Sequence, residues 1–92
     1  MKQVKRHSVL HDPKYRNMVV QLVAIRKRLE LTQAEFAKLL QTRQPEISKI
    51  ERFERKLDVV EFIAWLEVFS EAEKTNIHKI WKEMYDHYCE SD

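Results

Sequence analysis

Hydrophobic residues recur every three or four positions along most of the chain, which is the spacing of amphipathic helices. The first such stretch predicts a helix over about residues 13–30. Asp12 is a suitable N-cap for this helix, and Pro13 fits the first helical position, where the backbone N–H is not needed. The residues before it show no such periodicity, so we expect residues 1–11 to form a flexible N-terminal arm.

Two short helices joined by a tight turn are predicted next, over about residues 33–40 and 43–52. Thr32 and Glu35 form a capping box at the start of the first of them. Pro45 is tolerated only in the first turn of the second, so that helix starts within two or three residues before the proline. Such a helix-turn-helix can place its second helix in the major groove of DNA, although helical hairpins also serve as plain scaffold.

Two longer helices complete the predicted fold. Residues 58–69 are apolar over much of the helix surface, so we expect this helix to be central to the core. Ser70 and Glu73 predict a capping box for a last helix over about residues 71–88. The chain is therefore expected to be all-α with five helices, in one domain over residues 12–92.

Composition argues against several classes of protein. The chain has 92 residues, one cysteine and no glycine. Phosphate-binding loops and dinucleotide-binding turns need glycine, so enzymes that depend on them are not expected, nor is any cofactor. Cys89 has no partner for an intramolecular disulfide, there is no signal peptide at the start, and no apolar run is long enough to span a membrane. We expect a soluble cytoplasmic protein.

Metal binding and catalysis have little support in the sequence. His87 and Cys89 are two residues apart, a spacing that does not put both side chains on one face of a helix. The four histidines are scattered without the paired spacing of a zinc site. We expect neither a metal site nor an active site.

Charge is distributed unevenly along the chain. Residues 1–56 contain 14 Lys and Arg against 6 Asp and Glu, a net charge of +8, whereas residues 57–92 contain 3 against 9, a net charge of −6. A basic part that holds the helix-turn-helix suits a surface for nucleic acid, and the acidic part suits a separate partner.

Residues 22–69 resemble the helix-turn-helix domain of the Cro/phage-repressor family, also called the xenobiotic-response-element type. The resemblance rests on LTQAEFA at residues 31–37, QPEISKIER at residues 44–52 and RKLDVVEF at residues 55–62. It implies a five-helix lambda-repressor-like domain, here with an extended C-terminal helix, that binds double-stranded operator DNA, usually as a two-fold dimer. Family members usually have glycine near the positions of Gln41 and Phe53, so the geometry of both loops is expected to differ.

The resemblance also implies roles for individual residues. The residues expected to contact bases are Gln44 and Lys49, helped by Arg43 and Glu46; glutamine suits adenine and lysine suits guanine. The residues expected to contact phosphates are Gln33, Ser48, Arg52, Arg55 and Lys56. Arg26 and Glu51 correspond to an ion pair that bridges the first helix to the end of the third.

The last helix carries an apolar and aromatic stripe, of which Trp81, Met84, Tyr85 and Tyr88 are expected to form a homodimer interface. A monomer whose long helix lies on its own core is the alternative. We expect a sequence-specific DNA-binding transcriptional regulator, a repressor that occupies an operator as a dimer. Alternatives within the fold are an antitoxin, whose acidic part would hold a toxin, and a controller of a restriction–modification operon. An interaction module without DNA binding is the alternative from another class.

Overall fold

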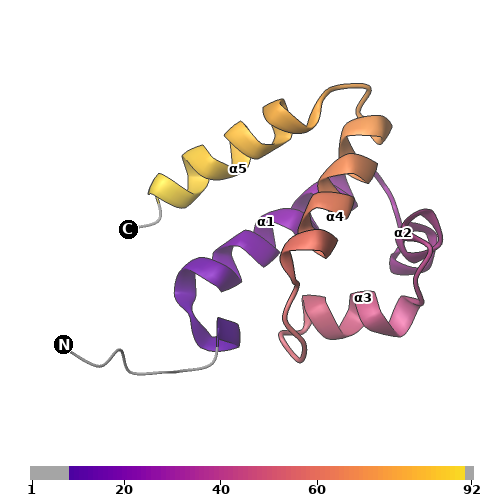
Figure 1. Cartoon of the computed structure of the whole chain (residues 1–92), viewed down its shortest axis with the longest axis horizontal. Helices are drawn as coiled ribbons and strands as arrows, with labels where there is room; N and C mark the ends of the chain where they lie inside the picture. The colour runs from indigo at the N-terminus through magenta and orange to yellow at the C-terminus, as the bar shows by residue number, and fades with distance from the viewer. Residues whose placement is uncertain (1–8, 91–92) are drawn as a thin grey trace.

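The computed structural model describes residues 9–90, and their side chains as far as residue 87. Within this range the chain forms five α-helices and one 3-10 turn, and no strand (Figure 1). The elements are η1 (Val9–His11), α1 (Pro13–Arg28), α2 (Gln33–Leu40), α3 (Gln44–Glu51), α4 (Val59–Ala72) and α5 (Ile77–Glu90). The predicted all-α, five-helix fold is confirmed. Figure 1 shows α1 and α4 in the middle of the molecule, with α3 and α5 on opposite sides of them.

Short polar side chains cap the N-terminal ends of α1, α2 and α4. Asp12 Oδ1 accepts a hydrogen bond from the Lys14 N–H at 2.8 Å at the start of α1. Thr32 and Glu35 make both halves of the capping box of α2. Asp58 and Glu61 make both halves of another at the start of α4, which satisfies free N–H groups there.

The expected boundary between the last two helices is wrong. Ser70 does not cap α5 but is buried within α4, where its hydroxyl donates to the Glu67 carbonyl at 2.9 Å. Because the Ser70 hydroxyl bonds within its own helix and does not cap a new one, α4 continues to Ala72. The last helix starts at Ile77, where Asn76 Oδ1 accepts from the Lys79 N–H at 2.8 Å.

The first residues described also differ from the expected arm. Val9–His11 form the turn η1, and Arg16 Nε of α1 donates to the Leu10 carbonyl at 2.6 Å. The part of the arm before Val9 lies outside the described residues.

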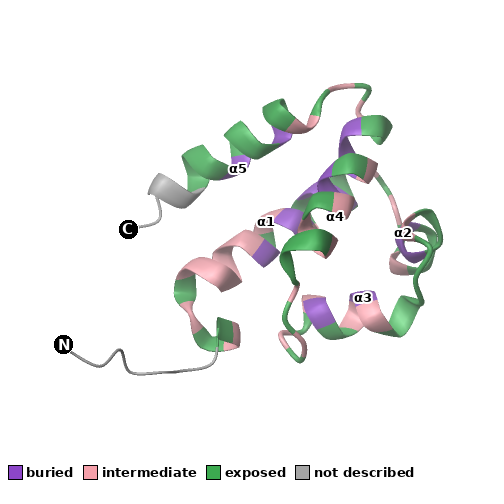
Figure 2. Cartoon of the chain, in the orientation of Figure 1, coloured by how far each residue is buried: buried purple, intermediate pink, exposed green. Residues whose placement is uncertain are grey.

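All five α-helices contribute residues to the core. Phe36 of α2 meets Trp65 of α4 edge-on, with 4.8 Å between ring centroids, and stacks on Phe69 at 5.0 Å. The buried hydrophobic residues are Val19, Leu22, Ile25, Phe36, Ala37, Ile47, Ile50, Trp65, Leu66, Phe69, Ile80 and Met84. Figure 2 shows the buried positions along the helices in purple. No helix among the residues described is long and apolar enough to cross a membrane.

Met84 corrects the expected dimer interface. Its side chain is only 1% exposed, because α5 turns this residue and Ile80 toward the core of its own chain. Arg28 of α1 also forms ion pairs with Glu73, in the loop before α5, and with Glu83 of α5 at 3.4 Å. Met84 therefore stabilises the single chain and is not available to a partner.

Four helices end on a non-glycine residue in the left-handed conformation. These residues are Glu30, Gln41, Phe53 and Lys74, with φ between 54° and 62°. After α2, the Thr42 N–H donates to the Ala37 carbonyl at 2.9 Å and the Gln41 N–H to the Lys38 carbonyl at 3.1 Å. This is the Schellman pattern, which usually places glycine at the left-handed position. In a chain without glycine, each such position costs about 1–2 kcal/mol.

Gln41→Gly should therefore stabilise the protein. Glycine removes the left-handed strain of about 1–2 kcal/mol. It also increases the conformational entropy of the unfolded chain, which costs about 0.5–1 kcal/mol, so we expect a net gain of about 0.5–1 kcal/mol in the free energy of unfolding. Urea unfolding followed by circular dichroism measures it. Lys38→Gly, inside the same helix, is the control and should lose about 1 kcal/mol. A Gln41→Gly variant no more stable than the parent would contradict the strain argument.

Candidate nucleic-acid interface

The eight-residue helix α3 presents one face to solvent and buries the other. Ile47 and Ile50 are buried against the core, each 1% exposed. On the other sides of the helix, Gln44, Lys49 and Arg52 are exposed. A short helix held by its apolar side, with long polar side chains exposed on the other, has the form needed to enter a major groove.

A buried ion pair fixes the end of this helix to α1. Arg26 Nε and Glu51 Oε2 are 2.7 Å apart, and Arg26 Nη2 donates to Glu51 Oε1 at 2.9 Å. Each side chain is 8% exposed. Arg26 Nη1 also donates to the Leu31 carbonyl at 2.6 Å, in the turn before α2. The expected pairing of Arg26 with Glu51 is thus present as a bidentate contact that joins three elements.

Two glutamines extend this contact toward the exposed face of α3. Gln33 Nε2 donates to Glu51 Oε1 at 2.9 Å, and Gln44 Nε2 donates to Gln33 Oε1 at 2.7 Å. Gln33 thus connects the buried carboxylate to Gln44, a role that the sequence analysis did not assign to it. The bond uses one of the two N–H groups of Gln44. Among the residues described, its Oε1 and second N–H have no hydrogen-bond partner, and these are the two groups that adenine binds.

Glu46 and Arg55, both expected to contact DNA, pair with each other in the folded chain. Arg55 Nε donates to Glu46 Oε1 at 3.0 Å, and its Nη1 donates to Glu61 Oε1 at 3.0 Å. Glu46 lies one turn before buried Ile50, at the margin of α3 that faces α4. The guanidinium therefore braces α3 against α4. Its hydrogen bonds to Glu61 hold the pKa of that carboxyl below the usual 4.5 and raise the pKa of Arg55.

The remaining cations expected at the interface border the exposed face of α3. Arg43 is exposed at the N-cap position, and Lys56 is exposed in the loop after the helix. Arg52 is 3.3 Å from Glu54, in an ion pair whose side chains are more than half exposed. Lys49 Nζ is 3.9 Å from the Glu46 carboxylate. Such exposed pairs are weak, so these cations can exchange their partners for phosphates at little cost.

Two contacts that the sequence analysis missed hold the loop after α3. The Leu57 N–H donates to the hydroxyl of Tyr15 in α1 at 2.9 Å. The guanidinium of Arg16 lies 4.6 Å from the centroid of the Phe53 ring. Phe53 thus gives α1 a cation–π contact at a position where family members usually have glycine.

Two helices joined by a tight turn, the second exposed and held by a buried ion pair, define a helix-turn-helix DNA-binding domain. The helix-turn-helix family model of the Cro/C1 type matches residues 22–71, more than half of the chain. The protein belongs to this family, which consists of DNA-binding regulators and not, typically, of enzymes. Comparison with curated proteins gives no match. Among the residues described, no three histidine, cysteine, aspartate or glutamate side chains come together to hold a metal ion.

Breaking one side of the buried ion pair should destabilise the fold strongly. Glu51→Leu leaves Arg26 buried without a counter-ion, and we expect a loss of about 3–5 kcal/mol in the free energy of unfolding, measured in urea. The double variant Arg26→Met/Glu51→Leu should recover most of it. Glu54→Leu, in an exposed pair, is the control and should change stability by less than about 1 kcal/mol. Equal losses in Glu51→Leu and Glu54→Leu would refute the assigned role.

The brace between α3 and α4 should make stability depend on pH. Because Arg55 lowers the pKa of Glu61 in the folded state, the stabilisation is complete above the unfolded pKa of about 4.5 and is lost as pH falls through the lower folded pKa. Glu61→Gln should therefore lose less stability than the parent between about pH 5 and pH 3. Urea unfolding at several pH values tests this, with exposed Glu67→Gln of the same helix as control. Parallel curves for the parent and Glu61→Gln would contradict it.

Proposed function

We propose that the protein is a transcriptional repressor that recognises a specific operator in double-stranded DNA and occupies it as a homodimer. The observation that carries the proposal is that α3 is exposed on one face and held in position by ion pairs. Its exposed face keeps polar side chains available to base edges. Its position is held from two sides, by Arg26 to Glu51 and by Arg55 to Glu46. A helix so placed reads sequence because its side chains meet the groove in one register.

Individual residues suit different parts of this function. Gln44, oriented by Gln33, would pair with adenine, and Lys49 would donate to guanine O6 or N7, with Arg43 beside the start of the helix. Ser48, Arg52 and Lys56 would contact phosphates and so position the protein without selecting a sequence. Gln33 is half-buried at the N-terminus of α2 and would add a phosphate contact there.

Repression then follows from occupation of the operator. Residues 57–92 have a net charge of −6 and contain none of the residues proposed to contact DNA. This acidic part is the feature that would suit an antitoxin, whose toxin would bind there. Gene neighbourhood distinguishes the two versions.

Substitution of two lysines should separate base reading from phosphate binding. Lys49→Ala should change the preferred operator bases, while Lys56→Ala should weaken all sequences alike and reduce the salt slope of binding by about 1. Selection from a random duplex library identifies the operator, and fluorescence anisotropy at several salt concentrations measures affinity.

Lys79→Ala, an exposed substitution on α5, is the matched control and should leave DNA binding unchanged. Uniform losses of affinity in both Lys49→Ala and Lys56→Ala would refute α3 as the reading helix. No binding to any duplex at low salt would refute DNA binding itself and favour an interaction module.

A further inference from the structure

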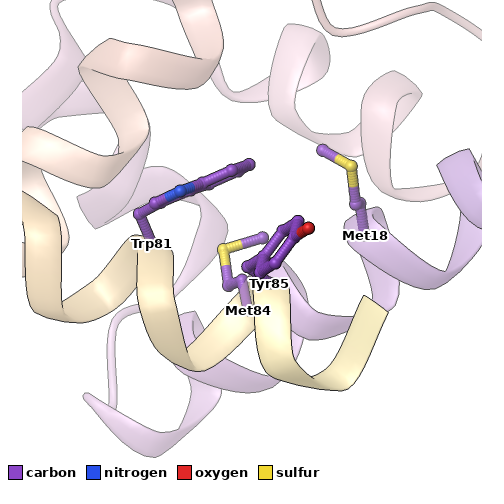
Figure 3. A pocket seen from close by; sticks show the side chains of 4 residues that line it. All are labelled: Met18, Trp81, Met84 and Tyr85. Atoms are coloured by element: carbon purple, nitrogen blue, oxygen red, sulfur yellow. The ribbon is translucent and has the colours of Figure 1, made fainter. Parts of the chain in front are cut away.

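A hollow of about 290 Å³ lies between α1 and α5. The side chains that line it are Met18 of α1 and Trp81, Met84 and Tyr85 of α5 (Figure 3). Figure 3 shows Met18 and Trp81 on opposite sides of the hollow, with Met84 and Tyr85 between them. Met84 is 1% exposed and forms the base, whereas Trp81 and Tyr85 are 41% and 49% exposed and form the rim. The hollow is therefore closed by the core on one side and open to solvent on the other.

The lining of the hollow favours an uncharged ligand. None of the four lining side chains carries a charge. The charged residues that follow the two rings on α5, Lys82 and Asp86, pair with each other at 3.4 Å, and both side chains are more than half exposed. A charged group that entered the hollow would lose its hydration without gaining a counter-ion from the lining, which costs free energy.

The two rings and the two thioethers favour a planar aromatic ligand. The Trp81 and Tyr85 rings are 5.8 Å apart between centroids, and their planes are tilted by 34°, so the rings do not stack fully on each other. Ring faces left open in this way suit offset stacking with another aromatic ring. The sulfur atoms of Met18 and Met84 suit the edges of such a ring. A planar aromatic molecule can make both kinds of contact, whereas a saturated molecule can make neither.

The volume of the hollow limits the size of this ligand. A dry apolar cavity of roughly 150 Å³ holds one benzene ring. The hollow between α1 and α5 has about 290 Å³, which suits two fused rings. It is lined by only four of the residues described, so it is too small for a peptide segment.

We propose that this hollow binds an uncharged, planar aromatic molecule of two fused rings, which acts as an effector of the DNA-binding protein. The effect on DNA rests on the proposed function, in which two copies of the chain occupy the operator. Trp81 and Tyr85 are two of the residues expected at the homodimer interface. A molecule stacked on their rings would cover surface that the partner subunit needs, so it would favour the monomer and weaken operator binding.

2-Naphthol is the probe for the site, because it is uncharged at neutral pH and consists of two fused aromatic rings. NMR of the whole chain with isotope-labelled methionine methyl groups measures its binding, since its ring currents shift the Met18 and Met84 signals. We expect saturable shifts with a Kd on the order of 100 μM. Anionic 2-naphthoate and non-planar decahydro-2-naphthol are the controls for charge and planarity, and each should bind about tenfold more weakly or less.

Two substitutions of Tyr85 test the stacking contact without threatening the fold, because this residue is exposed. Tyr85→Ala removes one ring and should weaken 2-naphthol binding about tenfold. Tyr85→Phe keeps the ring and should bind 2-naphthol as the parent does. Leu39→Ala, an exposed apolar residue of α2 outside the hollow, is the matched control and should also bind like the parent. Saturating 2-naphthol should weaken binding of the parent to its operator about tenfold, measured by fluorescence anisotropy.

The outcomes separate the site from the function on which its effect rests. No saturable shift with 2-naphthol, or equal binding by the parent and Tyr85→Ala, would overturn the site and leave the hollow to a side chain of a partner. Equal binding of 2-naphthoate or decahydro-2-naphthol would overturn the ligand class. Binding of 2-naphthol that leaves operator affinity unchanged would support the site and overturn its effector role. Binding of 2-naphthol by a chain that binds no duplex would support the site and refute the DNA-binding function.

Discussion

The buried ion pair between Arg26 and Glu51 is the contact on which the arrangement of the domain depends. It joins the C-terminal part of α1 to the last residue of α3, and through the Leu31 carbonyl it also fixes the turn before α2. A buried pair of this kind gains little net stability, because desolvation offsets its Coulomb energy. Its value lies in geometry. A bidentate contact permits one orientation of α3 relative to α1, and Gln33 transmits that orientation to Gln44.

The absence of glycine forces the turns to be stabilised in other ways. Four helices end in left-handed residues that carry side chains, and each costs backbone energy. At Phe53 the side chain offsets part of this cost, because its ring makes a cation–π contact with Arg16 of α1. In the described part of the chain, no such side-chain contact is seen for Gln41 after α2, which is exposed. The loop after α3 is thus tied to α1, whereas the turn between α2 and α3 depends on backbone hydrogen bonds.

Much of the fold was predictable because local signals agree with the tertiary structure. The start of α2 follows from its capping box, and α3 starts at Gln44, within the two or three residues before Pro45 that the proline predicts. The predictions failed where the local sequence permits two structures equally well and tertiary packing decides between them. Ser70 is a good N-cap by type, but burial draws its hydroxyl back into α4. Met84 and Trp81 belong to the same stripe of α5, and only the approach of α1 and α4 decides which of them is buried.

In the candidate site, too, contacts that depend on residue position in the family pattern were predictable, and contacts that depend on the path of a loop were not. The family resemblance indicated Arg26 and Glu51, since both members of the pair are recognisable by position. It could not indicate that Arg55 pairs with Glu46, because this depends on the path of the loop between α3 and α4. That pairing has an electrostatic consequence. Arg55 is neutralised by two carboxylates, so the attraction for DNA comes mainly from the exposed cations that border α3, and the acidic half of the chain repels DNA elsewhere. In the proposed function, the uneven charge would therefore orient the protein before any base is contacted, with α3 toward the duplex.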